Sequence, residues 1–190
     1  MNIEIQEQIL QFQNSQLVAW KAQDKSLIPA YLNVEELPFI RTQNVYSFGE
    51  IFVLRHYYEN GGWKGVLNYS LGSHRSRSPI RRHGKEMVDK LVPTEKLENY
   101  RRLRGTKQET NRGAGEPDLF LYRDTGEYMF IEVKKGKDRI RPIQLKCMAI
   151  IKRTIDCPVG IVYLQEEHQV YKPKTYVLDL DLFEGYLKKV

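Results

Sequence analysis

Two carboxylates and a lysine lie near one another in the sequence, in a pattern that suits metal-assisted hydrolysis. Asp118 follows a Gly-Glu-Pro triplet, and Glu132 and Lys134 come one short turn and one strand later. Carboxylate oxygens are the ligands that a hard divalent cation prefers, and the cation makes a bound water more acidic. A lysine beside that water can orient it, or orient the phosphate that it attacks. The three residues therefore predict a hydrolytic metal site.

A β-hairpin brings these side chains together. Two runs rich in aromatic and β-branched residues, 119–122 and 128–133, have the length of strands. The loop between them, Asp124-Thr125-Gly126, suits a type I turn followed by a left-handed residue, a conformation that glycine adopts without strain. This loop length places Asp118 opposite Glu132, with Cβ atoms roughly 5 Å apart. Lys134 shares the face of Glu132, because side chains alternate along a strand.

A simpler interpretation is that these charges are only solvated. Asp118 could be a turn residue after a proline, and Glu132 and Lys134 could form the exposed face of an edge strand. Two observations favour the metal site instead. Ile131 and Val133 continue a strongly apolar strand, and like charges placed opposite one another destabilise a hairpin unless something neutralises them.

At these positions the sequence resembles the VRR-NUC family of the PD-(D/E)XK nuclease superfamily. The family includes the nuclease domain of the Fanconi-anaemia-associated nuclease and small stand-alone phage and bacterial proteins. The resemblance extends from about Arg112 to Leu164, and one departure is 135–137, where relatives often carry a Gly-Pro pair. The matching residues are Gly115, Pro117-Asp118-Leu119, Glu132-Val133-Lys134, Asp138-Arg139-Ile140 and Gln144.

The resemblance implies a metal-dependent DNA nuclease that hydrolyses phosphodiester bonds, with Mg²⁺ or Mn²⁺ as its cofactor. Asp118, Glu132 and the Val133 carbonyl are the implied metal ligands. Lys134 and Gln144 complete the implied catalytic set of Asp118, Glu132, Lys134 and Gln144. Gln144 could instead be an ordinary surface residue at the start of a helix.

The resemblance also implies a third acidic ligand on an early helix, and Glu50 is the candidate. It lies in the mostly apolar segment 48–52, where an unpaired carboxylate would be costly to bury. Glu50 could instead complement the dipole at the start of its helix. Glu59 is a weaker candidate for the same role.

Positive charge is clustered along the chain, whose net charge is +6. Basic runs occur at 74–83, 101–104 and 134–137, and such runs suit contacts to phosphates, which give affinity without reading sequence. A solvated surface is the alternative for any one run, and the Arg-Ser stretch could be a localisation signal or a linker. DNA is the predicted partner, and the residues predicted to bind it are Arg75, Arg77, Arg81, Arg82, Lys135, Lys137 and Arg139.

The order of elements indicates an α/β fold with a restriction-endonuclease-like core, a mixed β-sheet of about four strands flanked by helices. Residues 1–45 are expected to form an N-terminal helical extension, with a helix over 1–22, and residues 46–190 the nuclease domain. Apolar spacing predicts further helices at 46–58, 84–91, 94–103 and 142–154. Strands are predicted at 119–122, 128–133, 159–164 and 176–180, and 63–83 is expected to be loop-like.

Composition excludes several classes of protein. With 41% hydrophobic and 28% charged residues, the chain is typical of a soluble globular protein, and no apolar run approaches the roughly 20 residues that span a bilayer. The N-terminus lacks the features of a secretory signal, and the two cysteines lack metal-ligand spacing and fit a reducing compartment. The expected location is intracellular, cytoplasmic for a bacterial or phage protein and nuclear for a eukaryotic one, with no membrane partner.

Two other functions stay open: a non-catalytic nucleic-acid-binding module on the same fold, and a sequence-specific restriction-type endonuclease. The intact set of Asp118, Glu132 and Lys134 favours an enzyme, because a decayed enzyme usually loses at least one such residue. No helix-turn-helix or zinc-finger pattern indicates base readout. The family resemblance implies structure-selective cleavage of branched, flap or junction DNA, in replication, recombination or repair. A homodimer is left open, since no clear apolar stripe marks an interface.

Overall fold

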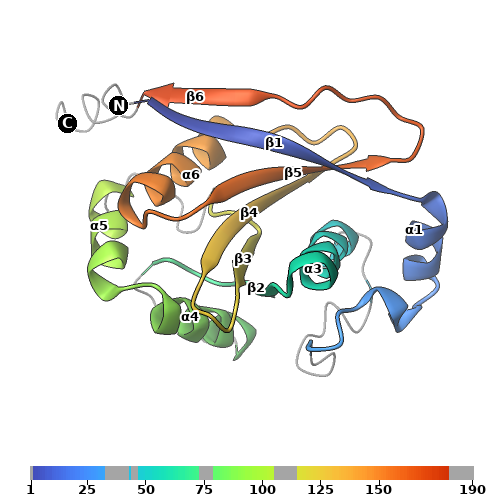
Figure 1. The fold of residues 1–190 in the computed structure, drawn as a ribbon, viewed down its shortest axis with the longest axis horizontal. Helices are drawn as coiled ribbons and strands as arrows, with labels where there is room; N and C mark the ends of the chain where they lie inside the picture. The colour runs from blue at the N-terminus through green and yellow to red at the C-terminus, as the bar shows by residue number, and fades with distance from the viewer. Residues whose placement is uncertain (1, 33–42, 44–46, 73–78, 105–114, 180–190) are drawn as a thin grey trace.

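Six strands form one mixed sheet in the computed structural model, which describes residues 2–32, 43, 47–72, 79–104 and 115–179. The strands are β1 (Asn2–Phe12), β2 (Lys64–Leu67), β3 (Leu119–Tyr122), β4 (Tyr128–Lys135), β5 (Val159–Glu166) and β6 (Thr175–Asp179). The helices are α1 (Asn14–Lys21), the 3-10 helix η1 (Lys25–Leu27), α3 (Phe48–Gly61), α4 (Pro79–Leu91), α5 (Thr94–Arg104) and α6 (Pro142–Thr154). Figure 1 shows the sheet between two groups of helices, α5 and α6 on one side and α1 and α3 on the other.

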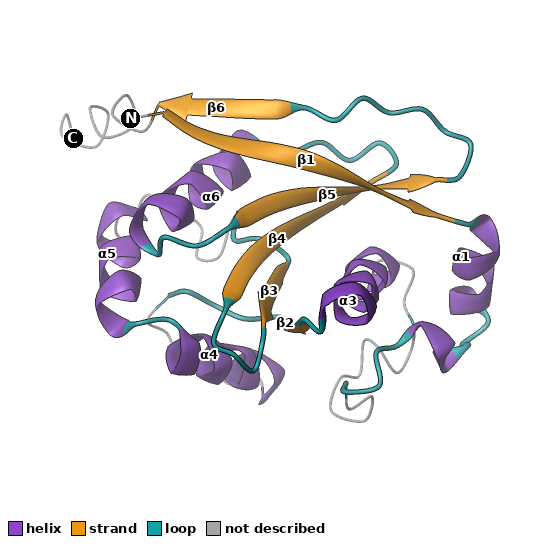
Figure 2. Cartoon of the chain, in the orientation of Figure 1, coloured by secondary structure: helices purple, strands orange, loops and turns teal. Residues whose placement is uncertain are grey.

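The centre of the sheet is parallel and its edges are antiparallel. Across the sheet the strands run in the order β2-β3-β4-β5-β1-β6. β4 and β1 each pair in parallel with β5, whereas β3 is antiparallel to β4, β2 to β3, and β6 to β1. Parallel neighbours need a long crossover, and the chain passes from β4 to β5 through α6 (Figure 2). Pro142 begins this helix in its first turn, where the missing N–H has no intrahelical partner to lose.

Side chains alternate between the two faces of β4, and each face packs against its own helices. Phe130 belongs to a core cluster with residues of α5 and α6, whereas its neighbour Ile131 belongs to a second cluster with residues of α1 and α3. A strand that is buried on both faces is expected to be apolar throughout. Glu132, which has no exposed surface, is therefore an exception that needs a chemical explanation.

The helix predicted over residues 1–22 is wrong for its first half. Residues 2–12 form β1, whose first positions alternate between exposed and buried, with Ile3 and Ile5 in the core. The apolar residues also fit a helical spacing, but a period of two lets β1 lie between β5 and β6 and pair with both. Only α1 is helical in this segment. The domain boundary at residue 45 stays a prediction.

The sheet has six strands rather than about four, because β1 and β2 were not expected. β2 lies within 63–83, which was predicted to be loop-like, and its four residues are too few to show a pattern; pairing with β3 makes it a strand. α4 begins at Pro79, ahead of the start predicted at Gly84, so Arg81 and Arg82 belong to a helix. The other predicted helices and strands are confirmed to within a few residues at their ends. Within the described ranges, every helix is too short or too polar to cross a bilayer.

Candidate metal centre

The hairpin that carries the site has the predicted register. Leu119 pairs with Ile131 and Tyr122 with Tyr128, and this register carries Asp118 to the position opposite Glu132. The turn is closed by two backbone hydrogen bonds between Arg123 and the residues that follow it, and Gly126 has a φ of +92°. A left-handed glycine at the end of a three-residue loop is the conformation that the sequence predicted.

Asp118 is held in place from two directions. The Tyr69 hydroxyl, itself buried, donates a 2.7 Å hydrogen bond to the Pro117 carbonyl. Gly115 has a φ of +86°, and a Cβ at this position would lie 2.7 Å from the Ile143 carbonyl oxygen in the first turn of α6. Glycine is therefore required at position 115 for two reasons, the positive φ and the close approach of the two chain segments. The segment before β3 is thereby fixed against the helix that follows β4.

Glu132 is the centre of a buried polar cluster. Its Oε1 accepts a 2.6 Å bond from Lys134 Nζ and a second, short bond from Gln144 Nε2. Gln144 is 4% exposed, and its own Oε1 accepts from the Arg141 N–H at the start of α6. The Lys134 side chain is 11% exposed. The structure thus brings Asp118, Glu132, Lys134 and Gln144 together.

The two carboxyl groups are held in an environment that disfavours their charged forms. Burial, and then the nearby Asp118 carboxylate, raise the pKa of Glu132 from 4.5 to about 8. Burial also raises the pKa of Asp118, against the opposing effects of the Val133 N–H, Lys134 and Arg141. One added positive charge between the two acids would reverse this balance, because it would favour both carboxylates.

The donor set fits a hard divalent cation. Glu132 Oε2 is buried, and no donor among the described residues reaches it; a proton shared with Asp118 or a bound cation would satisfy it. Asp118 Oδ2 accepts a 2.8 Å bond from the Val133 N–H. The N–H and C=O of a strand residue point to the same side, so the Val133 carbonyl faces the β3 edge of β4, as this N–H does, beyond the last β3–β4 pair. Two carboxylates and a carbonyl are ligands that Mg²⁺ and Mn²⁺ accept.

Glu50 lies near this group but does not complete a three-carboxylate cluster. Gly49 lets the start of α3 approach the sheet, since a Cβ there would be 3.2 Å from Leu164 and 3.3 Å from Val133 side-chain atoms. Burial raises the pKa of Glu50, and the charge of Asp118 raises it further. Among the described residues, no three acidic, histidine or cysteine side chains are gathered closely enough to hold one ion. The ligand role of Glu50 stays a prediction, as does its role at the helix start.

The predicted DNA-binding residues lie on separate elements. Arg75 and Arg77 fall outside the described residues, and for Arg81 only the helical backbone is described. Arg82 is exposed on α4, and Lys135 is half-buried at the end of β4. Lys137 and Arg139 are exposed in the turn that leads from β4 to α6.

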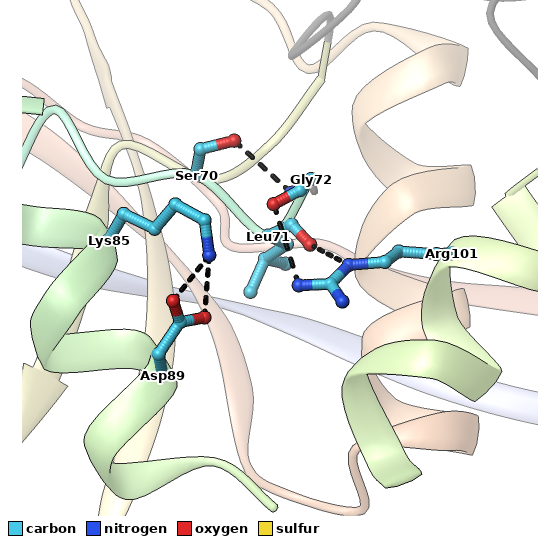
Figure 3. A network of polar contacts seen from close by, with 6 residues as sticks. All are labelled: Ser70, Leu71, Gly72, Lys85, Asp89 and Arg101. Carbon is cyan, nitrogen blue, oxygen red and sulfur yellow. Dashed lines mark hydrogen bonds and ion pairs between the residues drawn. The ribbon is translucent and has the colours of Figure 1, made fainter. Parts of the chain in front are cut away.

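The basic run at 101–104 has a structural use that the sequence did not reveal. Arg101 Nε donates a 2.9 Å bond to the Leu71 carbonyl, and its guanidinium also reaches the Gly72 carbonyl (Figure 3). In the same view Lys85 pairs with Asp89 one turn along α4. Arg101 therefore fixes the backbone after β2 and is not available to phosphate in this arrangement.

Two residues of the site were missed by sequence reasoning. Tyr69 contacts Pro117 from a segment predicted to be loop-like, and no local sequence pattern predicts that contact. Arg141 lies close enough to Asp118 to lower its pKa. Its place directly before Pro142, where a helix begins, is a signal that could have drawn attention to it.

Comparisons with known proteins show the family of the chain. The family model described as the VRR-NUC domain matches residues 70–165. Crystal structures of paFAN1 bound to a 2-nucleotide and to a 1-nucleotide 5′-flap DNA with a gap are similar over 81% and 88% of this chain, each at 17% sequence identity, with TM-scores of 0.40 and 0.38. The matched parts are only 30% and 33% of those chains. The search of characterised proteins gave no match.

Proposed function

The chain belongs to the VRR-NUC domain family, and we propose that it is a metal-dependent nuclease that hydrolyses phosphodiester bonds of DNA. The observation that carries the proposal is the buried Glu132. Its Oε2 has no donor among the described residues, and its Oε1 is held by Lys134 and Gln144. Lys134 supplies one positive charge to two buried carboxyl groups, and a bound metal ion would stabilise the charged forms of both.

The roles of the residues follow from their positions. Asp118, Glu132 and the Val133 carbonyl would hold Mg²⁺ or Mn²⁺, which when bound makes an attacking water more acidic and stabilises negative charge on the phosphate. Lys134 reaches Glu132 Oε1 and is placed to orient that water or a phosphate oxygen. Gln144 fixes the rotamer of Glu132, because its amide is anchored by the first turn of α6.

The proposed substrate is branched, flap or junction DNA rather than a particular base sequence. The exposed Lys137 and Arg139 in the turn after β4 support contacts to phosphates, which carry no sequence information. A nucleic-acid-binding module without turnover, and a sequence-specific restriction-type enzyme, are the competing functions. The first would leave the buried acidic pair without a purpose, and the second requires an element that reads base edges.

A panel of end-labelled DNAs tests the proposal. Single-stranded, duplex, flap and four-way-junction substrates are incubated with the full chain and Mg²⁺ or Mn²⁺, and products are resolved on a denaturing gel. Cleavage should require the metal and should be lost in Asp118→Asn, while Glu86→Gln, which changes an exposed glutamate of α4, should cut like the unmodified protein.

The alternatives predict different results in the same assay. Salt-sensitive binding without cleavage of any substrate, with either metal, would establish the binding module and reject the nuclease. Cleavage of duplexes at one sequence, whatever their branching, would establish the restriction-type activity. An Asp118→Asn variant that cuts at the unmodified rate would remove this residue from the reaction.

A further inference from the structure

A pocket of about 560 Å³ lies beside the candidate metal centre, and the proposed chemistry does not use it. Its volume is within the range of about 300–1,000 Å³ that is usual for small-molecule sites. Its lining combines two kinds of side chain that suit a nucleotide, three tyrosines and three basic residues: Tyr163, Tyr171, Tyr176, Lys137, Arg139 and Lys174.

The pocket is lined by residues of β5, α6 and the turn after β4, which adjoin the residues of the metal centre without including them. Tyr163 on β5 is the register partner of Lys134 on β4, so their side chains lie on the same face of neighbouring strands, which are about 4.8 Å apart. The turn 136–141, which forms another wall, begins just after Lys134 and ends at α6, whose Gln144 contacts Glu132. Tyr163 also donates a short hydrogen bond to the Gly136 carbonyl and so fixes that turn.

The aromatic wall is held rigid by a buried acid. The Tyr171 and Tyr176 hydroxyls each donate a 2.8 Å bond to the Glu7 carboxylate, and the Lys174 N–H donates a third of 2.9 Å. Glu7 itself is 9% exposed. The Tyr171 ring stacks on Tyr163 with centroids 4.0 Å apart and planes within 6°. The wall therefore needs little reordering to accept a ligand, which lowers the entropic cost of binding.

The cations of the pocket are placed for phosphate. Lys137 and Arg139 are exposed, and neither forms an ion pair with the part of the chain that the structure describes. Lys174 Nζ lies 5.9 Å from the centre of the Tyr171 ring. The two carboxylates of the lining are Asp138 and the fully bonded Glu7, so basic groups outnumber the acidic ones.

We propose that this pocket binds one unpaired nucleotide of the DNA strand, next to the phosphate that is cleaved. Its base lies against the tyrosines and its phosphate contacts Lys137, Arg139 and Lys174. Aromatic walls with neighbouring cations are the usual site for single-stranded nucleic acid, because every base has a ring face to offer. In a duplex those faces are covered by the adjacent base pairs. The inference rests on the proposed function, and it defines the substrate as DNA with an unpaired residue at the cutting site.

Binding without metal tests the pocket separately from catalysis. Fluorescence anisotropy in EDTA compares a labelled 12-nucleotide single strand with an abasic strand of the same length. The unmodified protein should bind the strand with bases about tenfold more tightly, within the range that stacking of one base supplies. Tyr171→Leu should reduce this ratio to below threefold, whereas Tyr171→Phe, which keeps the ring, should preserve it.

A second pair of variants tests the phosphate contact. Lys174→Gln should weaken binding of both strands, and Lys172→Gln, which removes an exposed charge on the same segment outside the pocket, should not. An equal loss of affinity in Lys174→Gln and Lys172→Gln would overturn the proposal. So would a Tyr171→Leu variant in which the ratio of affinities for the strand with bases and the abasic strand is unchanged. Displacement of the strand by an equal concentration of dTMP would assign the pocket to free nucleotides and also overturn it.

The two proposals can fail independently. If the expected affinity ratios are found but DNA is never cleaved, the nucleotide pocket is supported and the nuclease is rejected. If DNA is cleaved in Mg²⁺ or Mn²⁺ but both strands bind equally in EDTA, the nuclease is supported and the nucleotide pocket is rejected.

Discussion

Replacing Glu132 with glutamine should stabilise the metal-free protein at neutral pH, although it removes a predicted metal ligand. The glutamine oxygen can accept the bonds that Lys134 and Gln144 now donate to Oε1. Its amide nitrogen can donate toward Asp118, in place of the oxygen that has no donor among the described residues. The substitution therefore removes the proton that Glu132 must take up on folding at neutral pH, and it preserves the shape and the polar contacts of the side chain.

The size of the effect follows from the pKa of Glu132, which folding raises from 4.5 to about 8. Between these two values the folded protein holds a proton that the unfolded chain has released, so stability falls as pH rises through the window. Within this window each pH unit changes the unfolding free energy by about 1.4 kcal/mol. From pH 5 to pH 8, the unmodified protein should lose about 3 kcal/mol of unfolding free energy relative to Glu132→Gln.

Urea unfolding followed by circular dichroism measures this difference. Both proteins are unfolded in EDTA at pH 5, 6, 7 and 8, with Glu86→Gln as the control for an exposed glutamate. Mn²⁺ should then raise the midpoint of the unmodified protein more than that of Glu132→Gln, because the bound ion stabilises the folded state. If the unfolding free energies of the two proteins run parallel across this pH range, folding does not raise the pKa of Glu132 and the reasoning is refuted.

Three further variants test how the site is held. Gly115→Ala should destabilise the protein by about 1–3 kcal/mol more than Gly126→Ala in thermal unfolding, because both have positive φ but only Gly115 has a backbone oxygen 2.7 Å from the added Cβ; equal losses would contradict the contact. Tyr69→Phe leaves a buried carbonyl without its donor and should cost about 1–3 kcal/mol and slow cleavage, whereas Tyr100→Phe, which loses only a bond to a thiol, should not slow it. Lys134→Ala should lower turnover more than Mn²⁺ affinity measured by calorimetry, and a fall in affinity alone would make it a structural partner of the acid.

Local sequence was sufficient for the hairpin and for much of the helical structure. A three-residue loop ending in Gly126 fixes the register of β3 and β4 over only 15 residues or so, because turn geometry and strand alternation act between near neighbours. The same alternation places Glu132 and Lys134 on one face. Gln144 was assigned to the site from the family resemblance, and Pro142 marked the start of its helix.

The surroundings of those residues depend on contacts between distant segments. The sequence does not show that Arg101 is bonded to carbonyls near β2, or that Tyr69 supports Pro117, because each bond joins segments about 30 to 50 residues apart. The basic run at 101–104 therefore overstated the positive charge available to DNA, because Arg101 is bonded to backbone carbonyls. Burial in particular cannot be read from a strand alone, since it depends on what packs against each face.

The sequence by itself determined the arrangement of Asp118, Glu132 and Lys134, the residues proposed to carry the chemistry, because turn length and strand alternation fix it within one hairpin. Only the tertiary structure decided their electrostatic state and their neighbours. α6 and β5 close over Glu132 and remove it from water, which raises its pKa. β1 enters the sheet between β5 and β6 and brings Glu7 to the tyrosines of the pocket. Pairing between segments more than 150 residues apart leaves no local pattern, since it is selected by the packing of the whole sheet.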